Sequence, residues 1–202
     1  MLSEFLMFVR LGFLHITDLQ GADHILFLVA LAAIYRFRDA RDVLWVVTAF
    51  TVGHSVTLAL AVTGALDLPT GLIEFLIPVT IVATGVENLL VRDRERSLWG
   101  RRYRPVFAGV FGLVHGAGFA NYLRALFMDD IALPLFGFNV GIEVGQLTVL
   151  CAIAVALALI DRTIGAVRSA SQSPTPFRLR VITVSMVVAL VAARWAVERN
   201  PW

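Results

Sequence analysis

The chain has 202 residues, of which 58% are hydrophobic and 16% are charged, and its mean hydropathy is +0.81. A soluble domain is about half apolar and about a quarter charged, so this composition excludes an appended soluble domain and favours one integral membrane domain over residues 1–202. The net charge of +2 does not indicate a nucleic-acid partner, because the arginines gather in alternate loops of an otherwise apolar chain.

The first segment, residues 1–20, reads "MLSEFLMFVRLGFLHITDLQ". It lacks the basic start of a signal peptide, and Glu4 and Arg10 interrupt its apolar residues. Its apolar residues recur at helical spacing, which predicts an amphipathic helix lying in the outer interface or re-entering the membrane. A seventh full span is disfavoured because it would be short and would bury Arg10.

Six apolar stretches follow this segment. A helix needs roughly 20 residues to cross about 30 Å of hydrocarbon, and every stretch except the first reaches that length. The predicted spans cover about 22–36, 42–64, 70–91, 105–127, 135–160 and 179–198. The expected fold is therefore all-α: a polytopic membrane helix bundle of about six transmembrane helices plus the N-terminal helix.

The loops between these spans carry three, none, six, none and four arginines in chain order. The positive-inside rule places the Arg-rich loops in the cytoplasm. Both termini are then expected outside the cytoplasm, and the lipid bilayer is expected to be a bacterial inner membrane.

Ionisable residues within membrane spans are costly, so each is a candidate functional residue. His24, His54 and His115 each lie eleven or twelve residues above the charged inner end of their helix. At 1.5 Å per residue this places all three roughly 16–18 Å from the inner surface. Glu143 lies at a similar level, about 13 Å from the outer surface. The shared depth predicts one site near the midplane.

The short first span has a related interpretation. Membrane helices that bind substrates are often broken near the midplane, and Gly21 is the predicted break. Asp23 and His24 then occupy the first turn of a half-helix, where an Asp also caps free N–H groups.

Imidazole and carboxylate groups together suit divalent metals such as Ni, Co, Zn, Fe or Mn. The single Cys151 provides no cysteine cluster, which disfavours Cu(I). Asp23 can bind the ion or orient a histidine beside it. The predicted metal ligands are His24, His54, His115, Asp23 and Glu143.

Further polar residues are predicted to support the site or to line a pathway. They are Ser55, Glu74, Glu87, Asn139, Gln146 and His15. Structural roles remain as alternatives. Each histidine can instead donate a hydrogen bond between helices, and Asn139 and Gln146 can form interhelical contacts. Glu87 can be a solvated helix end.

Five motifs carry a resemblance to a known family. They are "GFLHITDLQGADHILFLVAL", "FTVGHSVTLAL", "EFLIPVTIVATGVENLL", "FGLVHGAGFANYL" and "FNVGIEVGQL". In this order, from about residue 12 to 150, they are similar to the motifs of the HupE/UreJ membrane proteins. The resemblance implies a nickel or cobalt permease with hydrogenase or urease accessory functions, and partners in metalloenzyme maturation or in the cell envelope.

The family's Asp-His pair corresponds to Asp23 and His24, and its other polar motif residues correspond to His54, His115, Asn139 and Glu143. The better-studied branch carries a histidine six residues before the Asp of that pair. Here that position is Thr17, and His15 lies eight residues before Asp23. This departure leaves the role of His15 and the choice of metal open.

Two other functions remain alternatives to metal transport. A buried zinc with an open coordination position activates water, so an intramembrane zinc-dependent hydrolase acting on lipid or peptide fits the same residues, with Ser55 positioning the substrate. Against it, the chain has no "HExxH" motif. A non-transporting assembly partner of an envelope complex is the third alternative.

Overall fold

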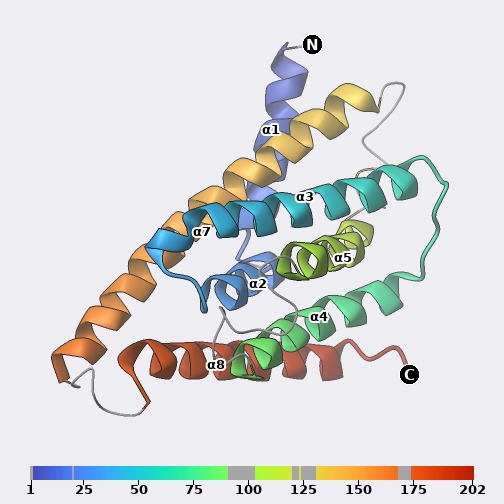
Figure 1. The fold of residues 1–202 in the computed structure, drawn as a ribbon. Helices are drawn as coiled ribbons and strands as arrows, with labels where there is room; N and C mark the ends of the chain where they lie inside the picture. Colours follow the sequence, from blue (N-terminus) through green and yellow to red (C-terminus); the bar gives the residue numbers. More distant parts are fainter. Residues whose placement is uncertain (1, 20, 91–102, 120–122, 124–130, 168–173) are drawn as a thin grey trace.

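The computed structural model describes residues 2–19, 21–90, 103–119, 123, 131–167 and 174–202, and Figure 1 shows their arrangement. The helices are α1 (Leu2–Thr17), α2 (Asp23–Ala32), the short 3₁₀ helix η1 (Phe37–Asp39), α3 (Ala40–Val62), α4 (Thr70–Leu90), α5 (Tyr103–Gly118), α7 (Ala132–Val167) and α8 (Pro176–Glu198). The all-helical membrane class predicted from the composition is confirmed.

Four segments of the described residues are long and apolar enough to cross a membrane: η1 with α3, α4, α7 and α8. The expected count of six is therefore not confirmed. Helix α2 has 10 residues and extends only about 15 Å. Helix α5 has 16 residues, and most of the remainder of the predicted span 105–127 lies outside the described residues.

Local signals explain where the longer helices begin and end. Thr175 caps α8 by accepting a hydrogen bond from the Arg178 amide, and Pro176 fits the first helical turn. Gly64 has a φ of 76°, a left-handed conformation that favours glycine and that ends α3. Helix α7 has 36 residues and extends about 54 Å, which exceeds the roughly 30 Å of bilayer hydrocarbon. It crosses the other long helices diagonally in Figure 1.

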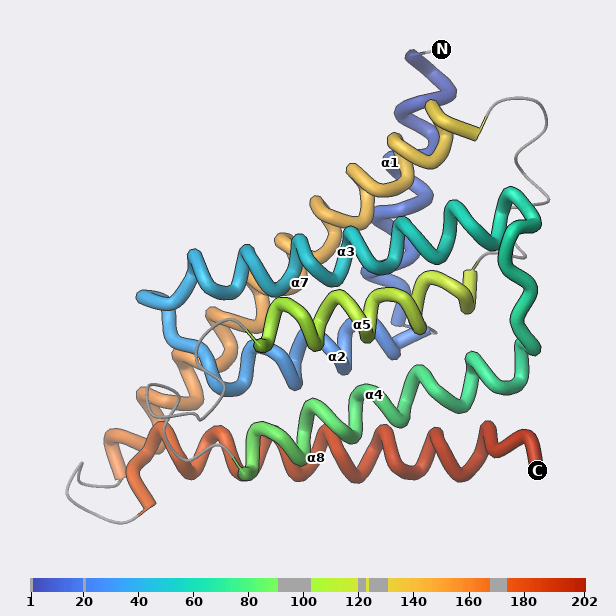
Figure 2. Tube along the Cα trace, turned by 45° about the vertical axis from the view of Figure 1, so that its right-hand side comes forward, coloured from blue at the N-terminus to red at the C-terminus, as the bar shows by residue number. Residues whose placement is uncertain are grey.

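Three helix pairs make up the bundle: α3 with α5, α1 with α7, and α4 with α8. Helix α2 lies between them, in contact with α4, α7 and α8, and Figure 2 shows it behind α5. Most of its residues are buried, including His24 and Phe27. His24, in the first turn of α2, is therefore enclosed by the other helices.

Glycines allow α3 and α5 to approach closely. A Cβ added at Gly112 would lie 2.1 Å from the carbonyl oxygen of Phe50, and one at Gly116 would lie 2.2 Å from that of His54. No larger residue fits without moving a backbone. These two glycines therefore belong to the packing surface of α5 against α3.

The N-terminal helix packs against α7 in the same way. A Cβ at Gly12 would lie 2.1 Å from the Phe138 carbonyl oxygen, and one at Gly141 would lie 2.0 Å from that of Val9. Helix α1 is thus held in the bundle by α7, while its depth in a membrane stays a prediction.

The described ends of the Arg-rich segments gather at one end of the bundle, toward the left in Figures 1 and 2. They include η1, the end of α4, the end of α7 and the start of α8. The alternating direction of the long helices follows the predicted loop pattern. Which side faces the cytoplasm remains a prediction.

Candidate metal centre

Three histidines from three helices meet inside the bundle: His15 of α1, His24 of α2 and His54 of α3. Each offers a ring nitrogen, and these nitrogens lie within 4.8 Å of one another. The ring centroids of His15 and His24 are 4.5 Å apart, and the His54 ring lies 5.9 Å and 6.0 Å from them. We call these residues the histidine trio.

The trio lies in an apolar core and its nitrogens are poorly satisfied. His24 is 7% exposed and His54 is 0% exposed. Among the described residues, Nε2 of His15, Nε2 of His24 and both ring nitrogens of His54 have no hydrogen-bond partner. An unsatisfied buried polar group costs about 1–3 kcal/mol, so several together indicate a place for a ligand.

His115 of α5 borders the trio. Its ring centroid lies 5.4 Å from that of His24, and its Nε2 lies 3.2 Å from Thr80 Oγ1. The Thr80 hydroxyl already donates to the Ile77 carbonyl at 2.7 Å, so the hydroxyl oxygen is left to accept from an Nε2–H. That tautomer leaves Nδ1, which is buried and has no partner among the residues that the structure describes, as an electron-pair donor. Its role as a ligand stays a prediction.

Aromatic rings surround these imidazoles. The Phe119 ring lies 4.1 Å from that of His15, and the Phe50 ring lies 5.2 Å from that of His115. Phe27 stacks on Phe50 at 4.8 Å. Such an apolar shell restricts water and lowers the local dielectric.

The two predicted carboxylate ligands have partners elsewhere. Both carboxylate oxygens of Asp23 lie 3.1 Å from Nη1 of Arg199, and Ala22 occupies the N-cap position of α2. Glu143 accepts a hydrogen bond of 2.9 Å from Thr48 Oγ1. Neither carboxylate is in the group of ligand atoms that defines the trio.

Polar contacts also link α3 to α7. Thr51 donates to the Gln146 side chain at 2.8 Å, and both residues are buried. This is the interhelical role that was the alternative for Gln146. Ser55 donates to the Thr51 carbonyl of its own helix at 2.6 Å. Asn139 has a buried Oδ1 without a partner among the described residues.

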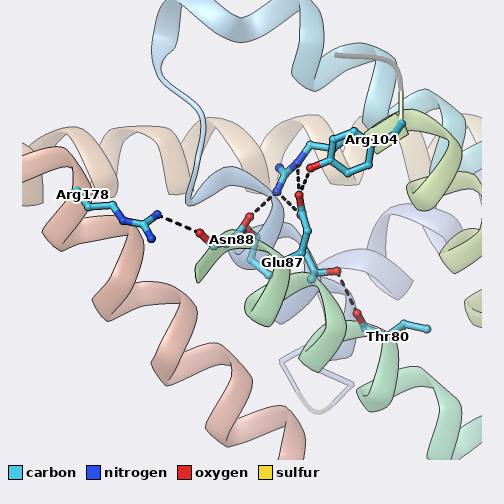
Figure 3. Close-up of polar contacts among 8 residues, drawn as sticks. Thr80, Glu87, Asn88, Arg104 and Arg178 are labelled. Atoms are coloured by element: carbon cyan, nitrogen blue, oxygen red, sulfur yellow. Dashed lines mark hydrogen bonds and ion pairs between the residues drawn. The ribbon is translucent and has the colours of Figure 1, made fainter. Parts of the chain in front are cut away.

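Glu74 is exposed on α4, whereas Glu87, near the other end of that helix, is ion-paired. Arg104 of α5 and the Tyr103 hydroxyl donate to its carboxylate, and Arg104 also reaches Asn88 (Figure 3). Asn88 in turn donates to the Ala30 carbonyl of α2 at 2.7 Å. Glu87 is therefore held in a network rather than being a freely solvated helix end.

Three residues around the site are absent from the sequence-based prediction: Thr48, Phe119 and Arg199. Arg199 had a usable signal, because it is a positive charge beyond the outer end of the last predicted span. His15 was predicted only as a supporting residue, because it lies eight residues before Asp23 instead of six.

The comparison with known proteins gives one result. A family model described as HupE / UreJ protein matches residues 1–199. No curated protein and no solved structure matches the chain.

Proposed function

Because the chain belongs to the HupE/UreJ family, which is associated with nickel and cobalt accessory or transport functions, we propose that it carries a divalent metal ion of the nickel or cobalt class across the membrane. The observation that supports this most strongly is the histidine trio. Its three imidazoles come from separate helices, are enclosed by apolar side chains, and have ring nitrogens without a partner in the described part of the chain.

The geometry of the trio suits a transiently bound ion. Nitrogens at about 2.0–2.1 Å from a tetrahedral ion lie about 3.4 Å apart. The ring nitrogens of the trio lie within 4.8 Å of one another, so the imidazoles must move closer together to bind one ion. Neutral imidazoles suit Ni, Co and Zn. Three neutral ligands leave further coordination positions to water, His115 or a carboxylate, and such an incomplete shell favours release.

A route toward the Arg-rich end follows one face of α4. Thr80 contacts His115, and Thr84 donates to the Thr80 carbonyl at 3.0 Å. Thr84 and Glu87 then line a small cavity of about 30 Å³ with Phe27, a ring that lies 5.6 Å from His115. We propose Glu87 as the inner stepping point for the ion.

An arginine pairs with a carboxylate on each side of the trio. Asp23 pairs with Arg199 and Glu87 pairs with Arg104. A cation that approaches either carboxylate competes with the guanidinium, so the pairs allow each carboxylate to attract an ion without holding it.

The zinc-dependent hydrolase and the non-transporting assembly partner are less well supported than metal transport. The family assignment provides no support for a zinc-dependent hydrolase. A non-transporting role in metalloenzyme maturation shares the family association, and only a flux measurement separates it from transport.

The deciding experiment uses purified protein in sealed vesicles that contain a metal-sensitive dye. We expect uptake of Ni²⁺ or Co²⁺ above that of protein-free vesicles, and loss of both uptake and binding in His54→Ala. Thr63→Ala is the matched control, because Thr63 lies exposed at the end of α3. Metal binding without any uptake would overturn the transport proposal. It would favour the non-transporting assembly role instead.

A further inference from the structure

A pocket with a basic lining opens where η1 meets α7 and α8. Its volume is about 640 Å³, far larger than the cavity beside Glu87. The charged and aromatic residues that line it are Arg36, Phe37, Arg38, Asp161, Phe177 and Arg180. Three arginines face one aspartate in this lining, so the pocket has an excess of positive charge.

Arg180 forms the buried wall of this pocket and is 3% exposed. It donates to Asp161, and its Nη2 reaches the carbonyl oxygens of Ala33 at 3.1 Å and Tyr35 at 2.9 Å. Its Nε has no partner among the described residues. Asp161 therefore compensates the charge of Arg180 and is the one carboxylate among the described lining residues. Asp39, next to Arg38, lies outside this lining and accepts a hydrogen bond of 2.9 Å from the Arg36 backbone amide.

Two guanidinium groups lie against one aromatic ring. The guanidinium carbon of Arg36 lies 4.1 Å from the centroid of Phe177, and that of Arg180 lies 4.7 Å from the same centroid. Like charges repel, and an anion between or beside them removes that cost. Packing on the Phe177 ring thus limits the motion of the Arg36 guanidinium, whose planar N–H donors suit an oxyanion.

The remaining wall of the pocket is apolar and belongs to α7. Ala154 and Ala158 line it, and the adjacent Val155 and Leu159 are 56% and 54% exposed on a helix long enough to span a membrane. A free inorganic anion gains no favourable contact from this apolar wall. A molecule with an anionic head and an apolar body matches both parts.

We propose that this pocket binds the phosphate headgroup of an anionic phospholipid from the surrounding bilayer. Arg36 and Arg38 donate to the phosphate oxygens, and the acyl chains lie along α7 at Ala154 and Ala158. Basic pockets between membrane helices recognise anionic headgroups by this combination. The site is separate from the histidine trio, and the inference does not depend on metal transport.

The test is native mass spectrometry of the purified full chain in a neutral detergent, titrated with phosphatidylglycerol or phosphatidylcholine. We expect retention of phosphatidylglycerol, with binding of phosphatidylcholine weaker by about tenfold or more. The double variant R36Q/R38Q should lose that preference, and R36K/R38K should keep most of it. Arg194→Gln is the matched control, because Arg194 is an exposed arginine of α8 that lies outside the pocket.

Equal binding of the two lipids by the unmodified chain would overturn the proposal, and so would full binding by a folded R36Q/R38Q variant. Displacement of phosphatidylglycerol by millimolar inorganic phosphate would assign the pocket to a free anion instead. If R36Q/R38Q loses its helical circular dichroism, the comparison of lipids on the unmodified chain decides the matter.

Discussion

Asp23 of α2 and Arg199, the residue that follows α8, form an ion pair in which both carboxylate oxygens lie 3.1 Å from one guanidinium nitrogen. The pair joins the first residue of α2 to the far end of the chain. Because Asp23 directly precedes His24, this contact places a charged pair beside the histidine trio. Through Arg199, the contact also couples the position of the segment after α8 to that of Asp23, a predicted metal ligand.

We expect Arg199→Gln to free the Asp23 carboxylate for a cation and so to raise the initial rate of metal uptake. The side chains are 33% and 16% exposed, so solvent screening limits the loss of stability to about 1 kcal/mol. Arg194→Gln, which breaks the exposed pair with Glu198, should change neither quantity. Slower uptake by Arg199→Gln would show that the pair assembles the site rather than restrains it.

The close contact of α3 with α5 predicts strong effects for small substitutions. Gly116→Ala should reduce stability by about 1–3 kcal/mol because the new methyl group meets the His54 carbonyl oxygen. It should also weaken metal binding, since it separates the helices that carry His54 and His115. Gly165→Ala is the control, because nothing lies within 4 Å of a Cβ at that position, and alanine favours a helix. Thermal unfolding in detergent and metal titration measure the two effects.

The contact of Thr80 with His115 predicts a role in orienting that imidazole. Thr80→Val removes the acceptor for Nε2–H, and we expect metal affinity to fall by about tenfold, as for other partners of ligating histidines. Thr80→Ser should restore it. Thr148→Val removes an exposed hydroxyl that bonds only to its own helix and is the matched control. Unchanged affinity in Thr80→Val would exclude His115 from the binding site.

The ion pair of Glu87 with Arg104 allows transport to be separated from binding. Glu87→Gln should slow uptake while equilibrium binding at the histidine trio stays nearly unchanged, because the carboxylate is needed only after the ion leaves the trio. Tyr103→Phe removes one hydrogen bond to Glu87 but keeps its charge, so it should retain most of the flux.

Arg104 is 7% exposed, and loss of its partner leaves a buried charge, so Glu87→Gln is also expected to lower stability by about 3 kcal/mol. Binding must therefore be measured on the same folded sample as flux. Normal flux in folded Glu87→Gln would remove Glu87 from the pathway.

The sequence alone was sufficient for the class of the protein and for the approximate positions of its helices. Hydropathy and arginine distribution are properties of short windows, and the cost of placing polar backbone or charge in lipid acts on each window separately. The predicted spans 42–64, 70–91 and 179–198 accordingly agree with α3, α4 and α8 to within a few residues. The shared depth of His24 and His54 follows from the same one-dimensional counting.

Only the tertiary structure decided which side chains meet. His15 joins the trio because Gly12 and Gly141 let α1 pack closely on α7, and the partner of Asp23 is Arg199, near the other end of the chain. The count of spanning helices also depended on it, since α2 has only 10 residues. Helix pairing depends on complementary surfaces of distant segments, and neither hydropathy nor depth along a helix records which way a side chain faces.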